Sequence, residues 1–261
     1  MATILDTIIA HKKEEVAAQK KLVTINALLQ QKRNRSFYSL KKSLTEEHSS
    51  GIIAEFKRKS PSKDWINQSA KSELIVPAYQ KAGASGVSIL TDSHFFGGSL
   101  NDLLAAAPLV DMPILRKEFM VDEYQIIEAA KAGADLILLI AACLEPEQVL
   151  HLAKTAHENG LEVLLEIHNQ KELRHITDEV DLVGVNNRDL HTFKTTLETS
   201  AELSPFIPDR CVKISESGIG SALDISYLKH FGYRGFLIGE SFMKTSDPGK
   251  ACNQFINEIK D

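Results

Sequence analysis

Residues 123–140, EYQIIEAAKAGADLILLI, join a helical pattern to a strand pattern through a single glycine. The first part spaces its apolar side chains with a helical period and ends at Gly133, the residue type that most often stops a helix. Residues 136–140 are continuously apolar, as expected of a strand that is buried on both faces of a parallel sheet. Residues 81–86, KAGASG, repeat the same junction. This recurrence is typical of a chain that alternates strands and helices.

Outward from this stretch, eight short apolar runs alternate with longer helical patterns. The predicted strands are 51–56, 86–90, 112–116, 135–140, 161–165, 181–185, 211–214 and 235–238. The predicted helices include 73–82, 123–132, 146–159, 223–231 and 249–259. Eight such units, with no Gly-x-Gly-x-x-Gly after the first strand, favour a closed (β/α)₈ TIM barrel of the α/β class over an open doubly wound sheet.

The length of 261 residues suits one such barrel, so we predict a single domain over 1–261. Residues 51–261 form the barrel in this prediction, and residues 1–50 form an N-terminal helical extension packed on it. The apolar residues that would pack are Ile4, Leu5, Ile8, Ile9, Leu28, Leu29, Phe37 and Leu40. The extension either covers apolar surface only or also helps to close the mouth of the active site.

Composition argues against several classes of protein. The formal charge is −5 and basic residues are spread along the chain, so nucleic acid is not an expected partner. No segment has the pattern of a signal peptide or a membrane span, and three distant cysteines indicate a reduced, cytoplasmic protein. The nine histidines show no metal-binding spacing, so no metal site is expected, and we place His94, His168 and His191 in loops or at helix starts.

Charged residues end four odd-numbered strands of the predicted barrel. They are Glu55 and Lys57 on the first, Lys117 on the third, Glu166 on the fifth and Glu216 on the seventh. Alternate strands contribute side chains to a common layer of the barrel, so these residues could meet above the core. In a partly dry cleft, carboxylates and ammonium groups reach pKa values suited to acid and base catalysis. Each residue taken singly could instead form an ordinary ion pair or lie on the surface.

Two further groups follow the late strands. Asn186 could orient a hydroxyl of a substrate, and Arg188 could brace its loop through a carboxylate. Alternatively, these residues form a polar turn without a role in binding. Residues 217–220, SGIG, and 239–241, GES, place glycines where backbone N–H groups can approach an anion. Loops after the seventh and eighth strands are the usual phosphate site of a TIM barrel, although glycine also ends strands for local reasons.

The strand ends resemble those of the indole-3-glycerol phosphate synthase family of tryptophan biosynthesis, from Ile53 to Met243. The segment 53–63, IAEFKRKSPSK, is the most specific, because the phosphate loops alone would fit many barrels. The other matching segments are 90–92 LTD, 95–99 FFGGS, 115–119 LRKEF, 164–168 LLEIH, 184–190 GVNNRDL, 215–219 SESGI and 236–241 FLIGES.

The resemblance implies a small phosphorylated substrate, 1-(2-carboxyphenylamino)-1-deoxyribulose 5-phosphate, which closes to indole-3-glycerol phosphate with loss of carbon dioxide and water. It implies no cofactor. We expect a monomer in contact with neither nucleic acid nor membrane, and we leave contacts with other enzymes of the tryptophan pathway open.

By resemblance, Lys117 is the general acid at the substrate carbonyl and Glu166 assists the proton transfers. The resemblance also makes Lys57 and Glu55 catalytic: Lys57, paired with Glu55, holds the substrate carboxylate before it leaves and can act as an acid in the second stage. The implied substrate-binding residues are Asn186, Arg188, Glu216, Ser217, Phe96 and Phe119, and the implied phosphate-binding residues are Ser60, Gly218, Gly239 and Glu240. Ser60 could instead cap a turn, and either phenylalanine could be a core residue.

The chain departs from the family pattern at two positions. Asp64 replaces the usual glycine, which is expected to change the mobility of the loop over the site. Glu118 replaces the usual aspartate after Lys117, a change that keeps the charge and is expected to be minor.

Three other functions remain open on the sequence alone. A phosphoribosyl-anthranilate isomerase would pair a cysteine or aspartate base with an aspartate acid, which Glu55 and Lys57 argue against. A Schiff-base aldolase would use Lys117 as its nucleophile. A sensor that only binds a phosphorylated metabolite would need the glycines and Ser60 but not Lys117 together with Glu166.

Overall fold

The computed structural model describes residues 3–33, 35–61, 63–189 and 192–260. Ser62 and Leu190 belong to the segments 53–63 and 184–190, which carry the family resemblance, and both lie outside the described residues. His191 also lies outside them.

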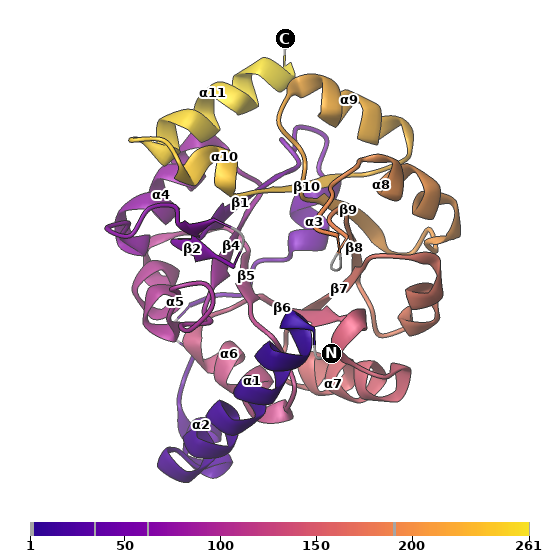
Figure 1. The fold of residues 1–261 in the computed structure, drawn as a ribbon. Helices are drawn as coiled ribbons and strands as arrows, with labels where there is room; N and C mark the ends of the chain where they lie inside the picture. Colours follow the sequence, from indigo (N-terminus) through magenta and orange to yellow (C-terminus); the bar gives the residue numbers. More distant parts are fainter. Residues whose placement is uncertain (1–2, 34, 62, 190–191, 261) are drawn as a thin grey trace.

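Eight parallel strands close into a barrel in the order β1-β10-β9-β8-β7-β6-β5-β4 (Figure 1). They are β1 (Ile52–Phe56), β4 (Gly86–Leu90), β5 (Ile114–Lys117), β6 (Leu136–Ile140), β7 (Glu162–Ile167), β8 (Leu182–Asn186), β9 (Val212–Glu216) and β10 (Gly235–Ile238). The predicted TIM barrel and its eight strands are therefore confirmed. The strands β5, β7, β8 and β9 run slightly farther than predicted, so Lys117, Glu166, Asn186 and Glu216 are strand residues.

Helices surround the barrel (Figure 1). They are α4 (Ser72–Ala82), α5 (Leu100–Ala106), α6 (Glu123–Ala132), α7 (Pro146–Glu158), α8 (Glu198–Leu203), α9 (Ala222–His230), α10 (Glu240–Met243) and α11 (Pro248–Lys260), with the short 3₁₀ turns η1 (Ala107–Leu109), η2 (Ala141–Cys143), η3 (Gln170–His175) and η4 (Ser204–Phe206). The helices α4 and α6 end at Gly83 and Gly133, whose φ angles of 92° and 99° lie in the left-handed region that glycine adopts without strain.

The apolar run 136–140 shows how the core is divided between the inside of the barrel and the layer under the helices. Leu136, Leu138 and Ile140 point into the barrel, where they pack with other inward-facing leucines and isoleucines. Ile137 and Leu139 belong to the larger cluster between the barrel and its helices. Because side chains of a strand alternate between its two faces, a run buried on both faces has to be continuously apolar.

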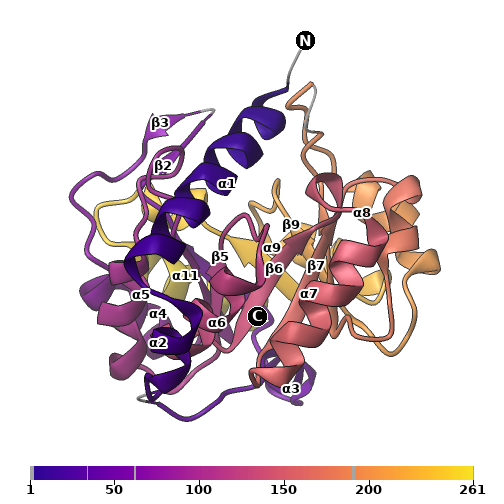
Figure 2. The ribbon, with the colours of Figure 1, turned by 90° about the horizontal axis from the view of Figure 1, so that it is seen from below.

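The N-terminal extension consists of α1 (Ile4–Leu22), α2 (Ile25–Gln30) and α3 (Leu40–Thr45). Figure 2 shows α1 running past the barrel strands toward α2, and α2 packs against α6. Leu40 and Leu44 of α3 join the inner core, and Leu40 lies so close to Gly86 that a Cβ there would be 2.7 Å from its Cδ1. Since Gly86 begins β4, α3 closes the barrel at the amino ends of its strands.

The predicted apolar surface of the extension is only partly correct. Ile8, Leu28 and Leu40 are buried, but Ile4, Leu29 and Phe37 are 41%, 50% and 45% exposed. In the short helix α2 only Leu28 is fully buried, with Ile25 partly buried against the same cluster. Phe37 lies in the extended chain between α2 and α3.

Two arginines fasten the extension near the amino end of β6. The carboxylate of Asp135, fully buried, pairs with Arg33 and with Arg35, whose Nη1 lies 2.8 Å from Oδ2. The same carboxylate accepts backbone hydrogen bonds from Tyr38 at 3.0 Å and Ile114 at 2.9 Å. A buried carboxylate with this many donors is compensated for its loss of water.

A buried lysine fastens α1 at the opposite end of the barrel. Lys12 Nζ, on a side chain only 1% exposed, lies 2.9 Å from Asp92 Oδ2 and 3.1 Å from Glu118 Oε1, and Glu15 on its own helix lies at 3.0 Å. Although burial disfavours the ammonium, Glu118 and Asp92 raise the pKa of Lys12. Asp92 also accepts the backbone N–H of Phe96, so this contact links α1 to the loop after β4.

We predict that Lys12→Met lowers the free energy of unfolding by about 3 kcal/mol or more, because it leaves two buried carboxylates without their cation. Urea unfolding followed by circular dichroism measures the loss. Lys13→Met, on an exposed neighbour in the same helix, is the control and should change stability by less than about 0.5 kcal/mol. Equal stability of the two variants would contradict the assignment of Lys12 as an anchor.

Candidate active site

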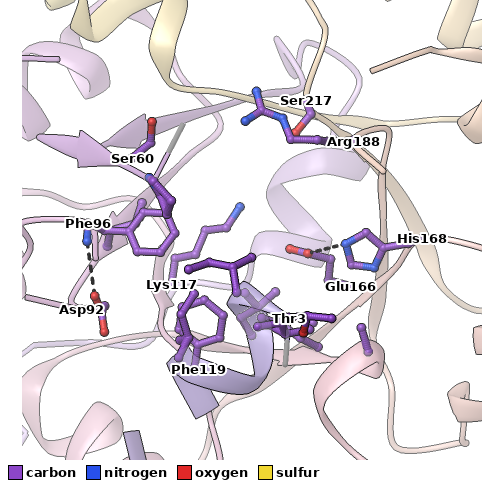
Figure 3. A pocket seen from close by; sticks show the side chains of 18 of the residues that line it. Thr3, Ser60, Asp92, Phe96, Lys117, Phe119, Glu166, His168, Arg188 and Ser217 are labelled. Carbon is purple, nitrogen blue, oxygen red and sulfur yellow. Dashed lines mark hydrogen bonds and ion pairs between the residues drawn. The ribbon is translucent and has the colours of Figure 1, made fainter. Parts of the chain in front are cut away.

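A cavity of about 580 Å³ opens at the carboxyl ends of the barrel strands (Figure 3). Its lining includes Lys57, Lys117 and Glu166 from strand ends, and Phe96 and Phe119 from the loops that follow β4 and β5. The volume is that of a site for a small organic molecule. The cavity therefore lies where a TIM barrel carries its active site.

The charged residues of alternate barrel strands meet as predicted. Lys117 Nζ lies 2.7 Å from Glu216 Oε2 and 3.4 Å from Glu55 Oε2, and Lys57 Nζ lies 2.5 Å from Glu55 Oε1. Glu55 and Glu216 are buried below the cavity and do not line it, whereas both lysines reach it. One ammonium thus bridges carboxylates from β1 and β9 across the top of the barrel.

These carboxyl groups do not titrate alike. Burial raises the pKa of Glu216 to about 7, since Glu166 and Glu55 add negative charge nearby and Lys117 compensates only in part. Burial acts on Glu55 in the same direction, but Lys57 and Lys117 outweigh it and hold its pKa below the usual value. Burial disfavours the ammonium of Lys117, yet Glu216, Glu55 and Glu166 raise its pKa. Lys117 is therefore protonated, and Glu216 can change charge near neutral pH.

Glu166 is held on one side of the cavity by two neighbours. Asn186 Nδ2 donates to Glu166 Oε1 at 3.1 Å, and His168 Nε2 lies 3.2 Å from the same oxygen (Figure 3). His168 was expected in a loop or at a helix start, and no role for it was predicted from the sequence. It follows the end of β7 directly and shares a strand face with Glu166 two residues earlier, the spacing that linked Glu55 to Lys57. This alternation was the pattern that could have identified it.

The side of the cavity opposite Phe119 carries Ser60, Arg188 and Ser217 (Figure 3). Glu240, the first residue of α10, also lines the cavity. Gly218 and Gly239 adjoin these residues but do not line it. A Cβ at Gly239 would lie 2.4 Å from Glu55 Oε1, so glycine is required here for the close approach of β10 to β1, whatever binds above it.

The two aromatic residues and Asn186 occupy distinct places. The rings of Phe96 and Phe119 lie 6.0 Å apart and both border the cavity, so neither is simply a core residue. Asn186 lies beneath the cavity, where its side-chain oxygen accepts the backbone N–H of Arg188 at 3.1 Å. Asn186 therefore braces both Glu166 and the loop that carries Arg188.

Both departures from the family pattern have structural consequences. Asp64 lies in β3 (Asp64–Trp65), which pairs with β2 (Lys59–Ser60) in a small sheet that the sequence did not predict. Its φ of 54° is left-handed, a conformation that suits the usual glycine better than aspartate. Glu118, which keeps the charge of the usual aspartate, pairs with Lys12 and accepts the backbone N–H of Phe119 at 2.9 Å.

The first residues of the extension also line the cavity, among them Thr3, Leu5 and Ile8. The extension thus forms part of the wall of the cavity. Within the described residues, no group of His, Cys, Asp and Glu side chains is arranged to hold a metal ion. No helix among residues 3–33, 35–61, 63–189 and 192–260 is long and apolar enough to cross a membrane.

Solved structures that are distant in sequence share the fold. A tryptophan synthase alpha subunit from Legionella pneumophila matches with a TM-score of 0.62 over 86% of this chain and 98% of that chain, at 12% identity. A structure described as native KDPGal matches with a TM-score of 0.58 over 80% of this chain and 92% of that chain, at 15% identity. At such identities the likeness shows the fold alone.

Relatives that are close in sequence show the family. The indole-3-glycerol phosphate synthase of Bacteroides thetaiotaomicron is 51% identical over 262 residues, which cover 100% of both chains. That of Geobacillus kaustophilus is 40% identical over 257 residues, 98% of this chain and 97% of the relative. Residues 5–255 match the family model described as indole-3-glycerol phosphate synthase. The chain therefore belongs to the indole-3-glycerol phosphate synthase family.

Proposed function

We propose that the chain is an indole-3-glycerol phosphate synthase that acts on 1-(2-carboxyphenylamino)-1-deoxyribulose 5-phosphate. The observation that carries this proposal is the placement of Lys117 and Glu166 in one cavity, with two aromatic rings on one side and polar, glycine-rich loops on the other. This arrangement suits a substrate with an aromatic ring at one end and a phosphate at the other.

The substrate would lie across the barrel mouth. Its aromatic ring would pack against Phe96 and Phe119, and Lys57 would hold the carboxylate on that ring. The phosphate would bind to Ser60, Gly218, Gly239 and the backbone of Glu240, with Ser217 and Arg188 on the same side. Asn186 and Glu216 would position the sugar hydroxyls from below, Glu216 through its contact with Lys117.

Lys117 would promote ring closure at the ribulose carbonyl. An ammonium has three N–H donors, and among the described residues two carboxylates, those of Glu216 and Glu55, take two of them. The third can donate to the carbonyl oxygen while the aryl carbon attacks the carbonyl carbon. The oxygen then becomes an alkoxide, a base stronger than an amine, so even the strongly held ammonium of Lys117 can protonate it.

Two eliminations would complete the reaction. The bond between the ring and its carboxylate breaks, carbon dioxide leaves, and the electron pair of that bond returns to the ring. The new hydroxyl then leaves as water with a proton from Lys57, and the CH2 carbon beside the nitrogen loses a proton to a base, so that a carbon–carbon double bond forms and the indole keeps its N–H. Glu166, ionised and facing the cavity, would assist these proton transfers.

The site argues against two of the other functions, the Schiff-base aldolase and the sensor. A Schiff-base aldolase needs a neutral amine as nucleophile, whereas the carboxylates around Lys117 favour its ammonium form despite burial. A sensor that only binds phosphate does not require an acid and a base in its site, whereas Lys117 and Glu166 line one cavity. We further propose that the protein acts as a monomer in the cytoplasm, which suits its three free cysteines.

The proposal predicts that Lys117→Met lowers kcat by at least about 10²-fold while the substrate still binds, because an acid acts mainly in the transition state. Product formation is followed by indole fluorescence, without added metal and with a chelator present. Lys117→Arg keeps the positive charge among the carboxylates and should fold normally, yet it should be as inactive, since a guanidinium does not release its proton. Turnover by both variants near the wild-type rate would exclude Lys117 as the acid.

A second prediction concerns the phosphate. Ser60→Ala should raise KM about tenfold or more with little change in kcat, since a hydrogen bond to a charged group contributes about 1.5–3 kcal/mol. Steady-state kinetics measure the effect. The control is the same substrate without its phosphate, for which wild type and Ser60→Ala should have the same kcat/KM. An effect of equal size on that analogue would show that Ser60 does not bind the phosphate.

A further inference from the structure

His168 lies between two carboxylates beside the cavity. Its Nε2 is 3.2 Å from Glu166 Oε1, and its Nδ1 is 3.2 Å from Glu172 Oε2 in η3. The imidazole is 7% exposed, and the two carboxylates are 7% and 13% exposed. Only Glu166 has a role in the reaction proposed above, so the pair formed by His168 and Glu172 needs its own explanation.

The geometry decides the charge of the ring. A neutral imidazole has one N–H donor and one lone pair, so one of its nitrogens would turn a lone pair toward an ionised carboxylate. An imidazolium carries an N–H on both nitrogens and is attracted to both neighbours. Two carboxylates at equal distance on opposite sides of the ring therefore favour the charged form.

We propose that His168 is a positioning residue for the synthase reaction, a fixed imidazolium that holds Glu166 ionised and directs it into the cavity. The inference rests on the proposed function and extends it to a residue that lines the cavity and acts on the reaction through Glu166.

The contacts of Glu166 support this role. Asn186 and His168 both approach its Oε1. Within the described residues, its Oε2 accepts no hydrogen bond. Figure 3 shows the carboxylate projecting from β7 into the cavity toward Lys117. One oxygen is thus held by the protein, and the other is available to exchange protons with the substrate.

Glu172 supplies a rigid support for His168. Its Oε2 accepts the backbone N–H of His168 at 2.7 Å, and its Oε1 accepts a hydrogen bond from Asn169 Nδ2 at 2.7 Å. The carboxylate therefore holds both the backbone and the ring of His168, and the turn η3 keeps it in place. Its negative charge also compensates the buried imidazolium when the substrate reaches Glu166.

The charged groups around the pair agree with this assignment. His168 faces Glu166 on β7 and Glu172 on η3, while Glu166 also interacts electrostatically with Lys117 on β5 and accepts a hydrogen bond from the neutral Asn186 on β8. Burial disfavours the imidazolium, but the two carboxylates raise the pKa of His168 to about 10. Burial disfavours ionised Glu166 as well, yet His168 and Lys117 lower its pKa to about 2. Both groups are charged between these values.

Replacing the imidazolium with a neutral side chain should raise the pKa of Glu166, because burial is then opposed by Lys117 and Asn186 alone. The acidic limb of kcat against pH, where Glu166 becomes protonated, should then move to higher pH by about one unit or more. A purely structural histidine would not produce this shift.

The experiment compares His168→Gln with His157→Gln in kcat, KM and pH profile. We expect His168→Gln to lower kcat about tenfold or more near neutral pH, to change KM by less than about threefold and to shift the acidic limb upward. Glu172→Gln should shift the limb in the same direction by less. His157 also bridges two carboxylates, Glu179 at 3.0 Å and Asp181 at 2.9 Å, but it ends α7 away from the cavity, so its variant should behave as wild type.

Nitrogen NMR of the imidazole in the wild-type protein without substrate tests the charge of His168 separately from turnover. A doubly protonated ring at pH 8 supports the inference, and a neutral ring at pH 7 overturns it even in an active synthase. Unchanged kcat and pH profile in both His168→Gln and Glu172→Gln also overturn it. Absence of product with wild-type protein would instead contradict the proposed function, whatever the NMR result.

Discussion

Closure of eight parallel strands into a barrel sets the position of both the core and the candidate site. Closure turns every second side chain inward, as Leu136, Leu138 and Ile140 show, and makes the last inward residues converge at one end. A charged residue at the end of a strand can then reach a partner from a strand that is not its neighbour. The meeting of Lys117 on β5 with Glu55 on β1 and Glu216 on β9 follows from this geometry.

Three buried or nearly buried cations at the mouth each contact two carboxylates from the barrel: Lys117 with Glu55 and Glu216, Lys12 with Asp92 and Glu118, and His168 with Glu166 and Glu172. Each cation is kept protonated by this surplus of negative charge, despite burial. The surplus also raises the pKa of Glu216, because Lys117 cannot compensate all the carboxylates near it. A site of this kind combines fixed charges with one carboxyl group that titrates near neutral pH.

The N-terminal extension connects the two ends of the barrel. Its first helix forms part of the cavity wall, and Lys12 anchors this helix to the loops at the mouth. At the opposite end of the barrel, Asp135 holds Arg33 and Arg35, and α3 closes the barrel. Lys12 pairs with the carboxylates that accept the backbone N–H groups of Phe96 and Phe119. The aromatic side of the site therefore depends on a helix that lies outside the barrel.

Periodicity and the alternation of side chains along a strand were enough to predict the barrel, its eight strands, the glycines that end α4 and α6, and the convergence of the charged strand ends. They did not reveal the partners of Lys12, the bridging position of His168, or the exposure of Leu29 and Phe37. Those features depend on the distances and angles at which segments far apart in the chain pack together. A buried charge is stable or costly according to which partners the fold places beside it, and no local pattern in the sequence identifies those partners.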